Sequence, residues 1–136
     1  MQGVKNKPEV FTAESGSGKY RLYAVVTPAG KDIAVSVTGG DRPHIGAVAV
    51  AQCVPGVNRK ERLDVSVSVI TLAGHKEDEI ARTMAMNLSR EFSVNVMVSA
   101  GMHWDGIPAR GIAAVCENSH KLCDVIIQEI KNRMQL

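Results

Sequence analysis

Residues 39–51 read GGDRPHIGAVAVA, a glycine- and proline-containing turn followed by a segment in which small residues alternate with valines. Alternation with a period of two predicts a β-strand, and a strand face made of small residues is packed closely by a neighbouring element. The segments Tyr20–Thr27, Ile33–Thr38 and Leu63–Val69 also have strand character. Because short connections join these strands, we expect antiparallel hairpins.

The period changes after Gly74, where Ile80, Met84 and Leu88 form one stripe of a helix. Residues 93–99 return to strand alternation. Pro108 suits the first position of a last helix, which reaches Met134 unless residues 118–120 interrupt it. The order β-β-β-β-α-β-α predicts an α+β fold, a mainly antiparallel sheet with two helices on one face.

Length and composition limit the class of protein. A chain of 136 residues is expected to form a single domain over residues 1–136. A net charge of +2 with scattered Lys and Arg argues against a nucleic-acid partner, and no apolar run approaches the length of a membrane span. The start of the chain has no apolar stretch of a secretory signal, and three cysteines without C-x-x-C spacing suit reduced thiols. We therefore expect a cytoplasmic protein.

Three turns combine glycine with polar side chains at the end of a strand or the start of a helix, where backbone can approach a ligand. They cover residues 39–44, 74–79 and 101–106. An arginine fork can bind a phosphate through two parallel hydrogen bonds, so Arg42 is the best anion anchor, unless it is a solvated turn residue. The candidate site residues are Gly39, Gly40, Arg42, His44, His75, Lys76 and His103.

The histidines of these turns allow a second interpretation. His44, His75 and His103 would converge on a metal or an anionic ligand if the turns meet, although no two have the close spacing of a zinc motif. Trp104 with Met102 would either cover a flat ring system or serve as a core or interface anchor. No nucleophile elbow or common nucleotide-binding loop is present.

The same three turns resemble those of a known family. The segments GGDRPHIGAVA (39–49), GHKEDEIA (74–81) and SAGMHWD (99–105) are similar to segments of the prenylated-flavin chaperones, the LpdD-like proteins. The resemblance implies a fold like that of proteasome-assembly chaperones, which act as dimers. It also implies binding of prenylated flavin mononucleotide (FMN), or FMN itself, and its delivery to a partner aromatic-acid decarboxylase.

With the resemblance, the residues suggest a carrier rather than an enzyme, since the turns supply no paired acid and base around a nucleophile. The phosphate would lie at Arg42 and the backbone amides near Gly39 and Gly40, and the flavin ring on the small-residue strand 45–51. An uncovered sheet face that includes Ala47, Ala49 and Ser66 predicts a homodimer. Two alternatives remain: a small metal-dependent enzyme that uses the turn histidines, and an assembly chaperone that binds only protein.

Overall fold

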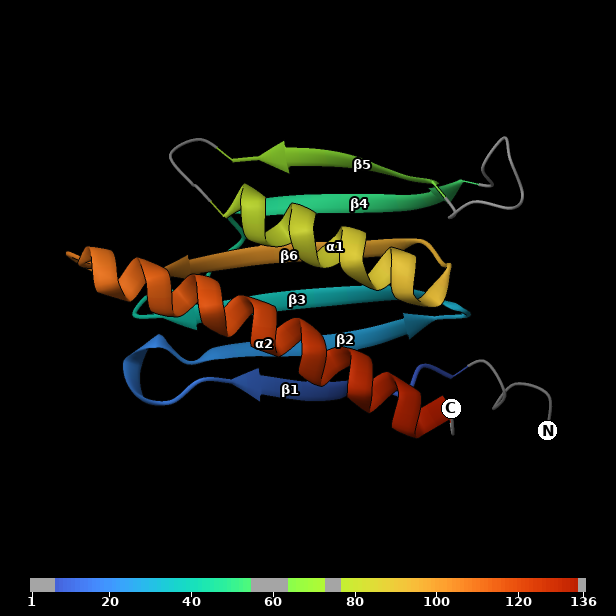
Figure 1. Ribbon diagram of the computed structural model, residues 1–136, viewed down its shortest axis with the longest axis horizontal. Helices are drawn as coiled ribbons and strands as arrows, with labels where there is room; N and C mark the ends of the chain where they lie inside the picture. The colour runs from blue at the N-terminus through green and yellow to red at the C-terminus, as the bar shows by residue number, and fades with distance from the viewer. Residues whose placement is uncertain (1–6, 55–63, 73–76, 135–136) are drawn as a thin grey trace.

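The computed structural model describes residues 7–54, 64–72 and 77–134, and these form one sheet with two α-helices on one face (Figure 1). The strands are β1 (Phe11–Ser15), β2 (Leu22–Ala29), β3 (Asp32–Gly40), β4 (Ala47–Val54), β5 (Asp64–Thr71) and β6 (Val96–His103). The helices are the short η2 (Gly18–Tyr20), α1 (Asp78–Phe92) and α2 (Ala109–Met134). The predicted α+β class and the placement of both helices on one face are confirmed.

The strand order is β1-β2-β3-β6-β4-β5, and every neighbouring pair is antiparallel except β3 and β6, which run parallel. The hairpins β2–β3 and β4–β5 are as predicted. The expected hairpin between β3 and β4 is wrong, because β6 lies between them. The turn that follows β3 donates hydrogen bonds to β6 instead, from Asp41 N to His103 O (2.7 Å) and from Gly46 N to Ala100 O (2.9 Å).

The strand β1 was not predicted. It places Phe11 and Ser15 on the buried side and Thr12 and Glu14 on the exposed side. A strand of five residues gives too short an alternation to be recognised from the sequence. The Ser15 hydroxyl donates to the carbonyl of Asn118 on α2 (2.6 Å). The Asn118 side-chain amide in turn donates to the carbonyl of Tyr20 (2.8 Å). These contacts satisfy polar groups of residues 118–120 that are buried against the sheet. The sequence left open an interruption of the last helix at this point, but α2 continues unbroken through it.

The core lies between the sheet and the helices. Ala47, Ala49 and Ala51 of β4 are fully buried, and β4 packs against α1. The close neighbour predicted for this small-residue face is therefore a helix of the same chain, and the flavin ring that we placed on it has no room there. We also expected Ala47 and Ala49 on the uncovered face, and this is wrong: of the three residues expected there, only Ser66 is exposed.

The uncovered face carries a row of apolar and hydroxyl side chains across the sheet. Strand register aligns one residue from each strand in a row over this face: Thr12, Val25, Ser36, Ser99, Val48 and Ile70. The neighbouring row adds Met97 and Val50, which are both more than two-fifths exposed.

Neither of the described α-helices has a segment long and apolar enough to cross a membrane.

Candidate functional site

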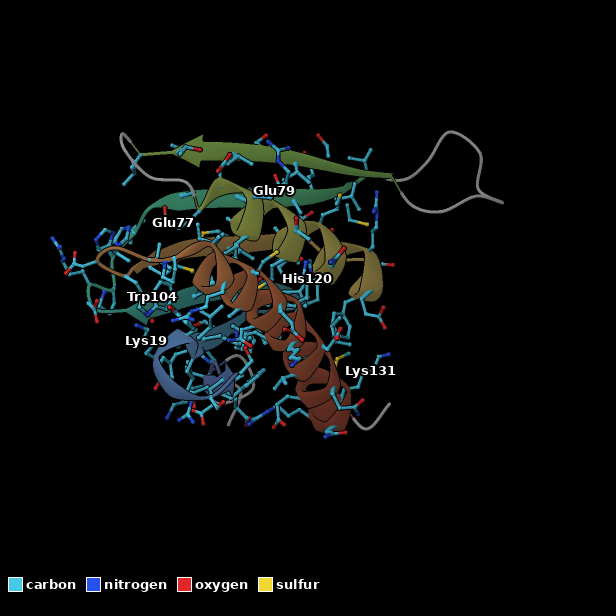
Figure 2. The ribbon with its side chains drawn as sticks, turned by 60° about the vertical axis from the view of Figure 1, so that its left-hand side comes forward. Lys19, Glu77, Glu79, Trp104, His120 and Lys131 are labelled. Atoms are coloured by element: carbon cyan, nitrogen blue, oxygen red, sulfur yellow. The ribbon has the colours of Figure 1, made fainter. Side chains whose placement is uncertain are left out.

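The candidate site lies at the sheet edge where β3 and β6 end. Because these two strands are parallel neighbours, their last residues, Gly40 and His103, are paired in register. The turn 41–46 then passes over the end of β6 before β4 begins. Helix α1 starts at the same edge, as the positions of Glu77 and Glu79 in Figure 2 show. This topology brings together two of the three predicted turns and the beginning of α1.

The glycines of this region serve a backbone crossing. Gly40 has φ +80°, and a Cβ there would overlap the carbonyl of His103. A Cβ on Gly101 would overlap the carbonyl of His44. The amides of Asp41 and Arg42 both donate to His103 O, at 2.7 and 3.4 Å. We predicted that glycine here lets backbone approach a ligand, but in the structure it lets the two turns approach each other, and these amides already have an acceptor.

An exposed ionic group, which we call the Asp105 cluster, consists of Arg42, His103 and Asp105. The guanidinium of Arg42 and Nε2 of His103 (3.0 Å) both contact Oδ1 of Asp105. The hydrogen bond from His103, and then the hydrogen bond and charge of Arg42, hold the pKa of the Asp105 carboxyl below its usual value. All three side chains are about half exposed or more. Arg42 is thus an exposed cation that is paired with an exposed carboxylate.

A second contact between a histidine and a carboxylate, the His44–Glu77 pair, is less exposed, and the His44 side chain is 24% exposed. Nδ1 of His44 donates to the carbonyl of Arg42 (2.8 Å), and its Nε2 lies 3.1 Å from Oε1 of Glu77. The same carboxylate oxygen accepts the backbone N–H of Met102 (3.3 Å). The Glu77 side chain is only 9% exposed. This pair ties the turn after β3, the end of β6 and the start of α1 together.

The sequence did not single out Glu77 as a site residue. Its partners Met102 and His44 lie 25 and 33 positions away in the chain, so the local pattern does not reveal them. The glycine at position 46 is related to this contact, because a side chain on that residue would occupy the place of the Glu77 carboxylate.

A cavity of about 430 Å³ opens beside the Asp105 cluster. Most of its walls are apolar side chains from α1, from the end of β6 and from the loop and first turns that lead into α2: Ile80, Met102, Trp104, Ile107, Ile112 and Val115. Glu77, Glu79, His103 and Cys116 also line it. Its volume is within the usual range for small-molecule sites.

Trp104 is fixed in the wall of this cavity. Its indole N–H donates to the carbonyl of Lys19 (2.5 Å), and its ring meets that of Tyr20 edge to face, with centroids 5.6 Å apart. Figure 2 shows Trp104 and Lys19 on the same side of the molecule. The ring is 7% exposed. The predicted role of a core anchor is therefore confirmed, whereas the covering of a flat ring system stays a prediction for a residue that lines the cavity.

Five of the seven predicted site residues come together at this edge: Gly39, Gly40, Arg42, His44 and His103. The other two, His75 and Lys76, lie outside the described residues. His44 and His103 each contact a different carboxylate. Within residues 7–54, 64–72 and 77–134, no group of three or more His, Cys, Asp and Glu side chains is arranged to hold a metal ion.

Comparison with known proteins agrees with this architecture. The solved structure of a chaperone complex for yeast 20S proteasome assembly contains a chain that superposes with a TM-score of 0.57. The match covers 88% of this chain and 97% of the other at 19% identity, so it establishes a shared fold. The predicted similarity to proteasome-assembly chaperones is confirmed.

Sequence comparison identifies the family. Protein LpdD of Lactiplantibacillus plantarum is 30% identical over 119 residues, which cover 86% of this chain and 81% of the relative. The family model of the prenylated flavin chaperone LpdD-like domain matches residues 16–131, which include β2 to β6, α1 and nearly all of α2. The chain belongs to the prenylated flavin chaperone LpdD-like family.

Proposed function

We propose that this protein binds prenylated FMN at the edge of the sheet described above and delivers it, in the cytoplasm, to a partner decarboxylase. One observation carries the proposal: an apolar cavity of about 430 Å³ adjoins an exposed cluster that contains an arginine and a histidine. A flavin mononucleotide matches both parts of this site, because it has a wide ring system at one end and a phosphate dianion at the other. Family membership supports the same ligand.

The phosphate would contact Arg42. An exposed ion pair such as that of Arg42 with Asp105 contributes little to stability, so a dianion can replace the carboxylate at small cost. A charge-assisted hydrogen bond to the phosphate contributes about 1.5–3 kcal/mol. His103 shares the same carboxylate and would donate to the phosphate or the ribityl chain. Backbone amides contribute less than we first expected, since those of Asp41 and Arg42 donate to His103 O.

The protein would hold and release its ligand without catalysis. His44 and Glu77 are engaged in joining three segments, and Glu77 also accepts the amide of Met102. The Asp105 cluster is exposed, so it excludes little water from a reacting group. An open site with one exchangeable ionic contact is suited to transfer, because the decarboxylase must bind the same ligand more tightly.

The proposal includes a homodimer formed by the uncovered face of the sheet. The row Thr12, Val25, Ser36, Ser99, Val48 and Ile70 crosses all six strands without a charged residue. An uncharged row is compatible with the same row of a second copy, and two sheets packed face to face bury such rows about 10 Å apart. Light scattering at micromolar concentration should give twice the monomer mass. The variant Val25→Glu should be monomeric, whereas Val125→Glu on the exposed side of α2 should remain dimeric.

The central experiment is expression together with a prenylated-flavin synthase, followed by purification. We expect a bound chromophore whose absorbance and mass are those of prenylated FMN. Mixing the loaded protein with apo-decarboxylase should then move the chromophore to the decarboxylase and start decarboxylation. If this protein alone turned over the substrate, the proposal of a carrier would be wrong and the protein would be an enzyme.

A further inference from the structure

A second cavity, of about 490 Å³, lies between the sheet and the ends of the two helices. Figure 1 shows α1 and α2 both ending over the edge of the sheet where β3 and β6 begin, opposite the edge of the candidate site. In Figure 2, Lys131 marks this end of the helical layer and Trp104 the other. Cys116 lines the cavity beside the Asp105 cluster, and Ile130 lines the second one, roughly 20 Å further along α2. The two cavities are therefore separate sites.

The second cavity has mostly apolar walls, and the turn between α1 and β6 fixes one of them. Ser93, which has φ +55°, ends α1 there, and its N–H donates to the carbonyl of Ser89 (2.8 Å). The hydroxyl of Ser89 donates to the carbonyl of Val94 (2.7 Å). The main apolar lining residues are Phe11, Val26, Ile33, Phe92, Val94 and Ile130. Because they come from the sheet and from both helices, the apolar interior is formed by the fold itself.

The charges around this cavity compensate one another. The charged lining residues are Glu9, Lys31, Asp32 and Arg133. Nε of Arg133 donates to Glu129 (3.0 Å), and the guanidinium lies over the ring of Phe11, 4.2 Å from its centroid. Oδ1 of Asp32 accepts the backbone N–H of Asn95 (3.1 Å). The carbonyls at the C-terminal ends of α1 and α2 add a partial negative charge. An anion would meet the two carboxylates and these carbonyls, and a cation would meet the two basic groups, so neither kind of ion is favoured.

We infer that the second cavity binds an uncharged, ring-shaped apolar molecule. Its volume lies in the usual range of small-molecule sites, and its apolar walls favour a ligand that leaves water without giving up the hydration of a charge. The two phenylalanine rings of the lining, Phe11 and Phe92, suit contact with another ring. The inference does not rest on the proposed function, because among the described residues the two cavities share no lining residue.

The first test measures the dissociation constant of 2-naphthol, a neutral two-ring probe, by calorimetry. The parent protein should bind it with a dissociation constant below about 1 mM. Met134→Ser should weaken binding by about three- to tenfold, because the Met134 side chain lines the cavity.

Ile112→Ser is the matched control for this substitution. Met134 and Ile112 are 57% and 58% exposed, and Ile112 lies on the same helix in the wall of the other cavity. Its substitution should leave the dissociation constant unchanged. A constant that is unchanged in Met134→Ser, or equally weakened in Ile112→Ser, would overturn the inference.

The second test varies the charge of the probe. 2-Naphthoate and 2-naphthylmethylammonium have the same ring system but carry a negative and a positive charge. Each should bind to the parent protein at least about fivefold more weakly than 2-naphthol, since burial of a charge is costly without a matching partner. If either ion binds as tightly as 2-naphthol, the inferred class of ligand is wrong.

Methyl NMR spectra locate the probe without reference to affinity. Saturating 2-naphthol should shift the methyl signals of Val94 and Ile130, which line the second cavity, and leave those of Ile80 and Val115 in place. Shifts at Ile80 and Val115 alone, or no binding of 2-naphthol by the parent protein, would overturn the inference. Either result leaves the proposed function untouched, because these measurements use no flavin.

Discussion

The site contains two contacts between a histidine and a carboxylate that differ in burial. In the His44–Glu77 pair the carboxylate side chain is 9% exposed and also accepts a hydrogen bond from a backbone N–H. The Asp105 side chain, by contrast, is 66% exposed where it contacts His103 and Arg42. Removing one partner of a buried pair leaves an unsatisfied polar group, but an exposed pair is replaced by water at little cost. The His44–Glu77 pair therefore holds the turns together, whereas the Asp105 cluster keeps the Arg42 guanidinium at the surface.

The largest effect is expected from Glu77→Ala, which removes the buried acceptor of both His44 and the Met102 amide. We expect the free energy of unfolding to fall by about 2–4 kcal/mol. Urea denaturation measures it. Glu79→Ala, which removes a carboxylate from the exposed position two residues later, should cost less than about 0.5 kcal/mol. Equal effects of the two substitutions would mean that the contacts of the Glu77 carboxylate contribute no more to stability than an exposed carboxylate does.

Arg42→Ala tests the exposed cluster by ligand binding. Loss of a charge-assisted contact should weaken binding of prenylated FMN by about 10- to 150-fold, while the free energy of unfolding changes by less than about 1 kcal/mol. Fluorescence titration gives the first quantity and urea denaturation the second. Arg90→Ala removes an equal charge from the last turn of α1 and should leave the affinity unchanged. Undiminished binding by Arg42→Ala would place the phosphate elsewhere.

Asp105→Asn should change the affinity in the opposite direction. The substitution removes the anion that competes with phosphate for Arg42 and His103, so binding of prenylated FMN should strengthen by about two- to fivefold. The same titration measures it, with Glu117→Gln, half of an exposed ion pair elsewhere on the surface, as the control. Weaker binding in Asp105→Asn would mean that the carboxylate positions the arginine rather than competing for it.

The smallest effect is the pH dependence of stability that Asp105 contributes. Its pKa is lower in the folded protein than in the unfolded chain, so the contribution is complete above the unfolded pKa of about 3.9 and is lost as pH falls through the folded value. The difference in unfolding free energy between the parent and Asp105→Asn should therefore decrease as the pH falls below about 4 and disappear once the carboxyl is protonated in the folded protein. A difference that does not decrease with falling pH would have a cause other than titration of this carboxyl.

Local pattern was sufficient to predict most of the elements. The alternation in residues 33–38 and the stripe of Ile80, Met84 and Leu88 gave a strand and a helix that the structure contains. The strand order was not predicted, since the pairing of β6 with both β3 and β4 depends on contacts between residues 45 to 63 positions apart. The wrong side chosen for Ala47 and Ala49 has a related cause: alternation defines two faces without stating which one a helix covers.

The candidate site was predicted to a similar degree. Arg42, His44 and His103 were recognised because they flank glycine-containing turns at strand ends, and the structure brings those turns together. The partners that determine the role of each side chain were not recognised. Glu77 and Asp105 differ from other surface acids only through tertiary contacts, and the cavity wall combines residues from three separate segments.

The central position of β6 has a consequence for the order of folding. Before residues 96–103 leave the ribosome, the chain can form the β2–β3 hairpin and the β4–β5 hairpin, but in the finished sheet these two groups of strands are joined through β6. Contacts of such long sequence separation form late and slowly. Both the pairing of Gly40 with His103 and the cavity walls on α2 require this step. On the proposed function, the cavity is incomplete in a nascent chain that lacks α2, so we expect loading to follow synthesis of the complete domain.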